Sequence, residues 1–191
     1  SALLLERDPP RMARSMIERW VPTIPFVSYF FARCGQVVGT RENCRILLDR
    51  DGCILVFPEG AEGIVKTYDQ AYQLQRFGLG FMRLALENDT PILPIGVVGG
   101  EEQIPAVWNF ESLAKLLGMP AFPVTPTWPL LGPLGGLPLP VKYRVYFGEP
   151  MTFEGASDDE DRHIQKKVDR VKDAIQSLLD RGLREREGIF F

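Results

Sequence analysis

Short apolar runs alternate with segments of helical periodicity along this chain of 191 residues, and the connections between them are short. The run Cys53–Phe57 is continuously apolar, as a strand covered on both faces requires, and Pro91–Val98 reads as a second buried strand. Strands that alternate with helices in this way form parallel sheets, because a helix carries the chain back between parallel neighbours. The pattern therefore predicts an α/β fold with a largely parallel sheet flanked by helices.

The remaining segments extend this alternation. Lys142–Phe147 alternates apolar and polar side chains, which predicts a half-exposed strand. Thr40 is a suitable N-cap for a helix of about ten residues that ends before Gly52. Further predicted elements are an extended segment at 11–17, a helix at 25–33, a strand at 35–38 and helices at 77–88 and 108–117.

The segment 157–182 is predicted to be a C-terminal amphipathic helix. Ser157 and Glu160 form the pattern of a capping box at its start, and Gly182 is a typical helix stop. The chain beyond it, 183–191, is charged and then apolar and is assigned no structure. The apolar stripe of the helix consists of Ile164, Val168, Val171, Ile175, Leu178 and Leu179.

Composition is that of one folded domain over residues 1–191. Charged residues make up 25% and hydrophobic residues 45%, and the formal net charge is −3. This mild acidity argues against a general nucleic-acid binder, which carries a basic excess. The cysteines Cys34, Cys44 and Cys53 are odd in number and lack metal-ligand spacing, so we predict reduced thiols of an intracellular protein and no metal site.

The interval 116–141 carries no charged residue and contains seven prolines, so it cannot form a helix that spans a membrane. No other stretch qualifies as a transmembrane helix. Two interpretations of this Pro-rich loop remain open. It is either an extended loop over the core or an apolar surface, with Phe122 and Trp128, that enters a bilayer or lines a lipid channel.

A carboxylate directly follows the first buried strand, in the sequence Phe57-Pro58-Glu59-Gly60. Ligands of open α/β sheets gather beyond the carboxyl ends of the strands. A carboxylate held by a rigid proline and freed by a glycine is placed to hydrogen-bond a hydroxyl or to orient its neighbours. The alternative is that Glu59 caps a helix or pairs with a lysine.

This block, together with Phe77-Gly78-Leu79-Gly80 and Thr90–Ile95, resembles the glycerolipid acyltransferase superfamily of the PlsC-like type. That family has an F-P-E-G block and a later V-P-V-x-P-V-like block at a similar separation, and Gly35–Arg41 is similar to its second block. The resemblance implies transfer of a fatty acyl group from a thioester, acyl-CoA or acyl carrier protein, to a glycerolipid hydroxyl. It implies no further cofactor.

The family's catalytic His-x-x-x-x-Asp block has no counterpart in the chain, so we assign no catalytic residue. In that block the histidine removes the proton of the acceptor hydroxyl. The one histidine, His163, shares a solvated helix face with Asp159 and Lys167. The block would precede Ser1, so we expect an N-terminally truncated domain, inactive alone, from an active parent protein; the alternative is an N-terminus left by processing.

The residues after the F-P-E-G block also depart from the family pattern. The family commonly continues with Thr-Arg-Ser, whose arginine helps to hold an acceptor phosphate. Here the sequence is Ala61-Glu62-Gly63, and Glu62 would repel a phosphate, although Lys66 and Arg41 could compensate. We therefore expect an acceptor without a phosphate, as in the diacylglycerol acyltransferase branch, while phosphatidate-type acceptors remain open. The predicted substrate-binding residues are Phe57, Pro58, Glu59, Gly60, Arg41, Lys66 and Glu62.

The resemblance also implies a cytoplasmic protein that is peripheral on the inner face of a membrane, where it meets its lipid. Aromatic residues that suit such a surface, or one face of a packed helix, are Trp20, Phe26, Tyr29, Phe30 and Phe31. The alternative function is a non-catalytic protein of the same fold that binds lipid or acyl thioester. A nucleotide-binding module is excluded because the chain lacks a Gly-rich loop with a lysine.

Overall fold

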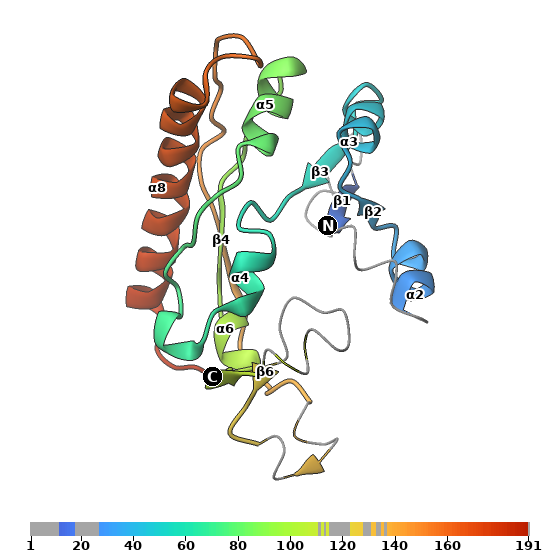
Figure 1. The fold of residues 1–191 in the computed structure, drawn as a ribbon. Coiled ribbons are helices and arrows are strands. Elements are labelled where there is room, and N and C mark those ends of the chain that lie inside the picture. Colours follow the sequence, from blue (N-terminus) through green and yellow to red (C-terminus); the bar gives the residue numbers. More distant parts are fainter. Residues whose placement is uncertain are drawn as a thin grey trace.

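The fold is mixed α/β (Figure 1), in a computed structural model that describes residues 12–17, 27–110, 112, 114, 123–127, 131–132, 135 and 137–190. The N-terminal half contains β1 (Ala13–Ile17), α2 (Val27–Arg33), β2 (Val37–Val38), α3 (Arg41–Leu48), β3 (Cys53–Leu55), α4 (Ala61–Val65) and a 3₁₀ turn, η2 (Tyr68–Gln70). The C-terminal half contains α5 (Gly80–Glu87), β4 (Ile95–Val98), α6 (Gly100–Gln103), β5 (Trp108–Asn109), β6 (Pro123–Val124), β7 (Arg144–Phe147) and α8 (Asp161–Glu185).

A parallel sheet is built from the first three strands, in the order β2-β1-β3. Met16 of β1 lies opposite Val37 of β2, and Arg14 lies opposite Ile54 of β3. The strands β4 and β7 form an antiparallel pair, and β5 and β6 form another. The parallel sheet with flanking helices confirms the predicted fold class, but the strands predicted at 91–98 and 142–147 form the antiparallel pair β4–β7 and do not join that sheet.

Helix α8 packs along one side of the β4–β7 pair and carries the largest part of the core (Figure 1). Its residues Ile164, Val168 and Val171 are buried and contact Phe77 and Met82. Leu179 joins a second cluster with Tyr72 and Val98. The predicted apolar stripe is therefore confirmed, because the residues that recur at helical spacing are the buried ones.

The predicted ends of this helix were wrong. The helix begins at Asp161, and no side-chain capping bond forms at its N-cap Glu160; instead the carbonyl of Ser157 accepts a hydrogen bond from Arg83. Gly182 does not end the helix, which continues to Glu185. Gly182 is buried inside it, where a Cβ atom would lie 2.5 Å from the Tyr146 ring and 2.7 Å from Val98. A close approach between α8 and the β4–β7 pair is therefore the reason for this glycine.

The N-terminal elements largely agree with the predictions. Thr40 caps α3, since its hydroxyl oxygen accepts a hydrogen bond from the Asn43 N–H at 3.2 Å. The predicted elements at 11–17, 25–33, 35–38 and 77–88 appear as β1, α2, β2 and α5, of which β2 and α5 are shorter than predicted. The predictions for Trp20, Phe26, Phe122 and Trp128 lie outside the described residues, as does most of the loop 116–141.

Three strand and helix predictions need correction. The strand β3 is half-buried and ends at Leu55, and Phe57 is 65% exposed, so the run is not covered on both faces. The predicted buried strand at 91–98 is shorter, and its Val97 is exposed. The predicted helix at 108–117 starts as β5, because Trp108 pairs with Val124 of β6.

The strand β7 is half-exposed, as predicted, but it spans only Arg144–Phe147 of the predicted 142–147, and the apolar side chains of its alternation are the exposed ones. Tyr146 faces α8, where the Arg181 guanidinium lies 5.0 Å from the ring centroid. Val145 and Phe147 lie on the other face and are about half exposed. Among the described residues, no helix has both the length and the apolar character needed to cross a membrane.

Candidate functional site

The F-P-E-G block forms a tight turn directly after β3. The Gly60 N–H donates to the Phe57 carbonyl at 3.0 Å, and Gly60 has a φ of 55°, a left-handed conformation that favours glycine. The Pro58 carbonyl accepts a hydrogen bond from the Gly78 N–H at 2.9 Å. Because Gly78 lies just before α5, this bond ties the turn to the start of that helix.

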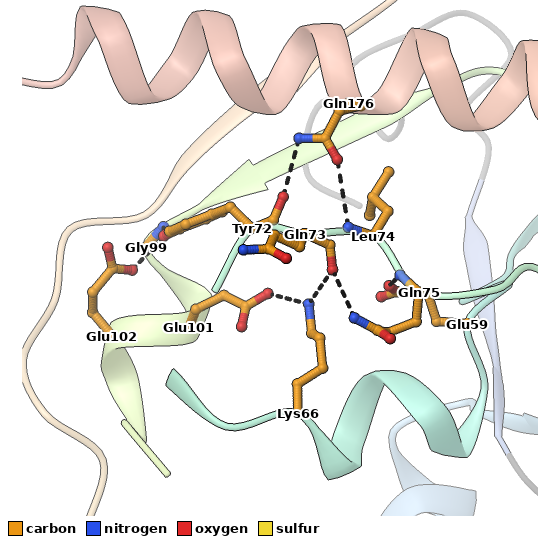
Figure 2. Close-up of polar contacts among 10 residues, drawn as sticks. All are labelled: Glu59, Lys66, Tyr72, Gln73, Leu74, Gln75, Gly99, Glu101, Glu102 and Gln176. Carbon is orange, nitrogen blue, oxygen red and sulfur yellow. Dashed lines mark hydrogen bonds and ion pairs between the residues drawn. The ribbon is translucent and has the colours of Figure 1, made fainter. Parts of the chain in front are cut away.

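The Glu59 carboxylate accepts a hydrogen bond from the backbone N–H of Gln75 (Figure 2). Gly63 lies close beside it, since a Cβ atom at this position would be 3.0 Å from Glu59 Oε2. Among the residues that the structure describes, Glu59 thus caps no helix and pairs with no lysine. Its carboxylate instead holds the F-P-E-G turn against the segment 66–75.

Lys66 is buried and already has a carboxylate partner. Its side chain is 5% exposed, and its ammonium lies 2.7 Å from Glu101 and 3.3 Å from the Gln73 carbonyl (Figure 2). A phosphate bound at this position would have to compete with Glu101 for the positive charge of Lys66. The Lys66 ammonium therefore stabilises the segment 66–75, which holds Glu59, and it is not free to bind a ligand.

Arg41 and Glu62 lie apart from these contacts. Arg41 is in the first turn of α3, with an exposed side chain whose guanidinium is 3.8 Å from the Glu87 carboxylate. It lines a polar cavity of about 260 Å³ together with Glu42, Arg45, Glu87 and Ser157. Glu62 is exposed in the first turn of α4, just past the F-P-E-G turn. The structure thus joins Glu59 and Lys66 through one segment, while Arg41 pairs with α5.

A buried polar network lies next to this site, and the sequence analysis did not predict it. The Tyr72 hydroxyl donates to Glu102 and accepts from the Gly99 N–H at 2.7 Å, and Arg186 donates to the other oxygen of Glu102. Burial and the neighbouring Glu102 carboxylate raise the pKa of Tyr72 well above its usual range, so the hydroxyl stays protonated and donates. The network ties the segment 66–75 to the end of β4.

Helix α8 also holds this segment, through Gln176. Its amide donates to the Tyr72 carbonyl at 3.0 Å and accepts from the Leu74 N–H at 3.4 Å (Figure 2). The segment is therefore anchored by α8 on one side and by Glu101 and Glu102 of α6 on the other. Of this arrangement, the sequence shows only that Glu101 and Glu102 follow the glycine pair Gly99-Gly100 at the end of a strand.

His163 is exposed in the first turn of α8, and its backbone N–H donates to the Glu160 carbonyl at 2.9 Å. The predicted solvated position of this histidine is confirmed. In the described part of the chain, no group of three or more His, Cys, Asp or Glu side chains could hold a metal ion. Cys44 is buried, which raises the pKa of its thiol.

Comparisons with known proteins match almost the whole chain. A family model described as Acyltransferase matches residues 1–98. An uncharacterized protein of Mycobacterium leprae (strain TN) is 38% identical over 97% of this chain and 52% of its own length. One of Mycobacterium tuberculosis (strain ATCC 25618 / H37Rv) is 37% identical over 97% of the chain and 53% of its own length.

Two more distant proteins also match. The DGAT1/2-independent enzyme synthesizing storage lipids of Gallus gallus is 22% identical over 93% of this chain and 49% of its own length. The crystal structure of PlsC, the 1-acyl-sn-glycerophosphate (LPA) acyltransferase of Thermotoga maritima, aligns with 92% of this chain and 58% of its own, at 15% identity and a TM-score of 0.49. The chain spans about half the length of the curated relatives that it matches.

Proposed function

The chain belongs to the acyltransferase family, and from this premise we propose that it acts in an O-acyltransferase that uses a glycerolipid as acceptor. The donor is an acyl thioester, carried by coenzyme A or by acyl carrier protein. The reaction takes place at the cytoplasmic face of a membrane, where the protein is peripheral. The observation that carries this proposal is the F-P-E-G turn inside the matched region, with Glu59 holding it to the segment 66–75.

The chemistry requires a base, because a hydroxyl is a poor nucleophile at neutral pH. The acceptor oxygen loses its proton to the base and attacks the thioester carbonyl carbon, the C–S bond breaks, and the thiolate takes up the proton as it leaves. In this proposal the F-P-E-G turn positions the acceptor, and a His-x-x-x-x-Asp block supplies the base. The one histidine of these 191 residues, His163, is exposed on α8, so we propose that they do not catalyse alone.

The proposal is tested by acyl transfer from labelled acyl-CoA to monoacylglycerol, diacylglycerol or lysophosphatidate, with the lipid product separated and counted. In the active protein, Glu59→Gln is expected to lower kcat/KM about tenfold, because a neutral amide forms a weaker bond to the Gln75 N–H than a carboxylate does. The matched control Glu154→Gln changes an exposed carboxylate and should leave the rate unchanged.

A binding protein without turnover is the second candidate, favoured by the exposed position of His163. It predicts that the 191-residue chain retains acyl-CoA, measured by equilibrium dialysis, while no acyl product forms with any acceptor. Acyl product from the protein that carries a His-x-x-x-x-Asp block, lost when its histidine is changed, would exclude this candidate.

The charge at Glu62 is expected to select against phosphorylated acceptors. Since Glu62 is exposed beside the F-P-E-G turn, Glu62→Arg should raise kcat/KM for lysophosphatidate about fivefold and leave that for diacylglycerol unchanged. The same charge reversal at exposed Glu154 serves as the control for a general effect of net charge. An unchanged ratio between the two acceptors would contradict the proposed acceptor class.

A further inference from the structure

A group of large apolar side chains is exposed around β5 and the segments beside it. We call this region the apolar lobe, and define it as residues 103–110, 123–127, 131–132, 135 and 137–141. Trp108 is 68% exposed, and the other exposed large apolar side chains of the lobe are between 44% and 61% exposed. The exposed large apolar side chains of the lobe are Ile104, Val107, Trp108, Phe110, Leu131 and Leu137.

Backbone hydrogen bonds join these segments into one surface. The Val107 N–H donates to the Val124 carbonyl at 2.9 Å, next to the pairing of Trp108 with Val124. The Leu139 N–H donates to the Gln103 carbonyl at 2.8 Å, so the segment that contains Leu137 lies beside Ile104. Figure 1 shows β6 next to α6, at the end of the molecule where α8 also ends.

The lobe contains no Asp, Glu, Lys or Arg. The centre of a protein–protein interface is also poor in charged residues, but arginine is enriched in such interfaces and the rim is polar. A bilayer imposes the opposite requirement, because a charged side chain is costly to insert and tryptophan is favoured at the interface. An apolar surface with no charge and an exposed tryptophan therefore matches a lipid surface better than a protein partner.

The exposed aromatic pair on α2 provides a contrast. Tyr29 and Phe30 are 62% and 63% exposed, but the Arg33 guanidinium lies 4.3 Å from the centroid of the Tyr29 ring. A charged group therefore covers part of this face of α2. Compared with this face of α2, the apolar lobe is the surface that a bilayer accepts without burying a charge.

We propose that the apolar lobe is the surface by which this protein inserts into a membrane, an inference that rests on the proposed lipid substrate. The strands of the lobe are two residues long, and irregular backbone of this kind does not enter the hydrocarbon core where it faces lipid. Insertion is accordingly shallow, with the side chains reaching the acyl boundary. Because the lobe has no basic residue, binding does not depend on anionic lipid.

The test is co-sedimentation of the protein with vesicles of phosphatidylcholine alone and of phosphatidylcholine mixed with phosphatidylglycerol, at low and high salt. The double variant Trp108→Glu/Phe110→Glu is expected to lower partition to both kinds of vesicle at least about tenfold. The matched variant Tyr29→Glu/Phe30→Glu, with the same change on α2, should alter it less than about twofold. Circular dichroism and the melting temperature check that both variants are folded.

Unchanged vesicle binding by a folded Trp108→Glu/Phe110→Glu protein would overturn the proposal, and so would binding that requires phosphatidylglycerol and disappears at high salt. Self-association of the wild-type protein that is lost in the lobe variant, without vesicle binding, would instead identify a contact between proteins. Because no acyl donor is present, these results are independent of turnover. Acyl transfer to a short-chain, water-soluble acceptor, measured without vesicles, tests the proposed function separately.

Discussion

Replacing Glu102 with alanine is expected to lower the free energy of unfolding by about 3 kcal/mol. Glu102 is 4% exposed and accepts hydrogen bonds from both Tyr72 and Arg186. Its removal leaves a buried hydroxyl without its acceptor and a guanidinium, 25% exposed, without its counter-charge. Breaking one side of such a pair costs more than the pair contributes, because the remaining charge stays desolvated.

Chemical denaturation of Glu102→Ala, Arg186→Met and the double variant measures this effect. We expect the double variant to lose less stability than the sum of the two single variants, because it leaves no unpaired charge. Glu154→Ala, at an exposed carboxylate, should change the free energy of unfolding by less than about 0.5 kcal/mol. Equal losses for Glu102→Ala and Glu154→Ala would show that the buried network does not stabilise the fold.

Gly182→Ala is expected to lower the free energy of unfolding by about 2 kcal/mol, although alanine is the better helix former. The added methyl group would lie 2.5 Å from the Tyr146 ring and 2.7 Å from Val98, which is buried. To relieve this overlap, α8 would have to move away from the β4–β7 pair, which would loosen the apolar contacts along the helix.

Gly80→Ala is the matched control, because it makes the same change in a helix where a Cβ atom would meet nothing within 4 Å. This variant should be as stable as the wild type or slightly more stable. Thermal melts of the two variants, followed by circular dichroism at the helix band, give the comparison directly. A Gly182→Ala protein that melts at or above the wild-type temperature would contradict the close packing at this position.

Features encoded by neighbouring residues could be predicted well. The apolar stripe of α8 follows from helical spacing alone, and Thr40 caps α3 because its hydroxyl oxygen and the N–H that donates to it are three residues apart. The F-P-E-G block identified the family and placed the turn after β3. In each case the interacting residues, or the residues that form the pattern, are close together in the sequence.

Predictions failed where a distant segment decided the outcome. Residues 108–117 carry a helical pattern, and the described Ser112 and Ala114 are helical, but Trp108 and Asn109 pair with β6 and form β5 instead. Gly182 has the sequence signal of a helix stop, but the nearby Tyr146 ring makes it a packing glycine in a continuing helix. The sequence left open whether Lys66 could compensate for Glu62, and only the structure pairs Lys66 with Glu101.

The sequence by itself determined the family, the α/β alternation and which face of the last helix is buried, because periodicity and short motifs report these locally. The tertiary structure alone decided how each buried polar group is satisfied. The partners Lys66 and Glu101 are 35 residues apart, and Glu102 and Arg186 are 84 apart. A buried charge must find a partner of opposite charge, but only the packing of α6 and α8 around the segment 66–75 selects which one.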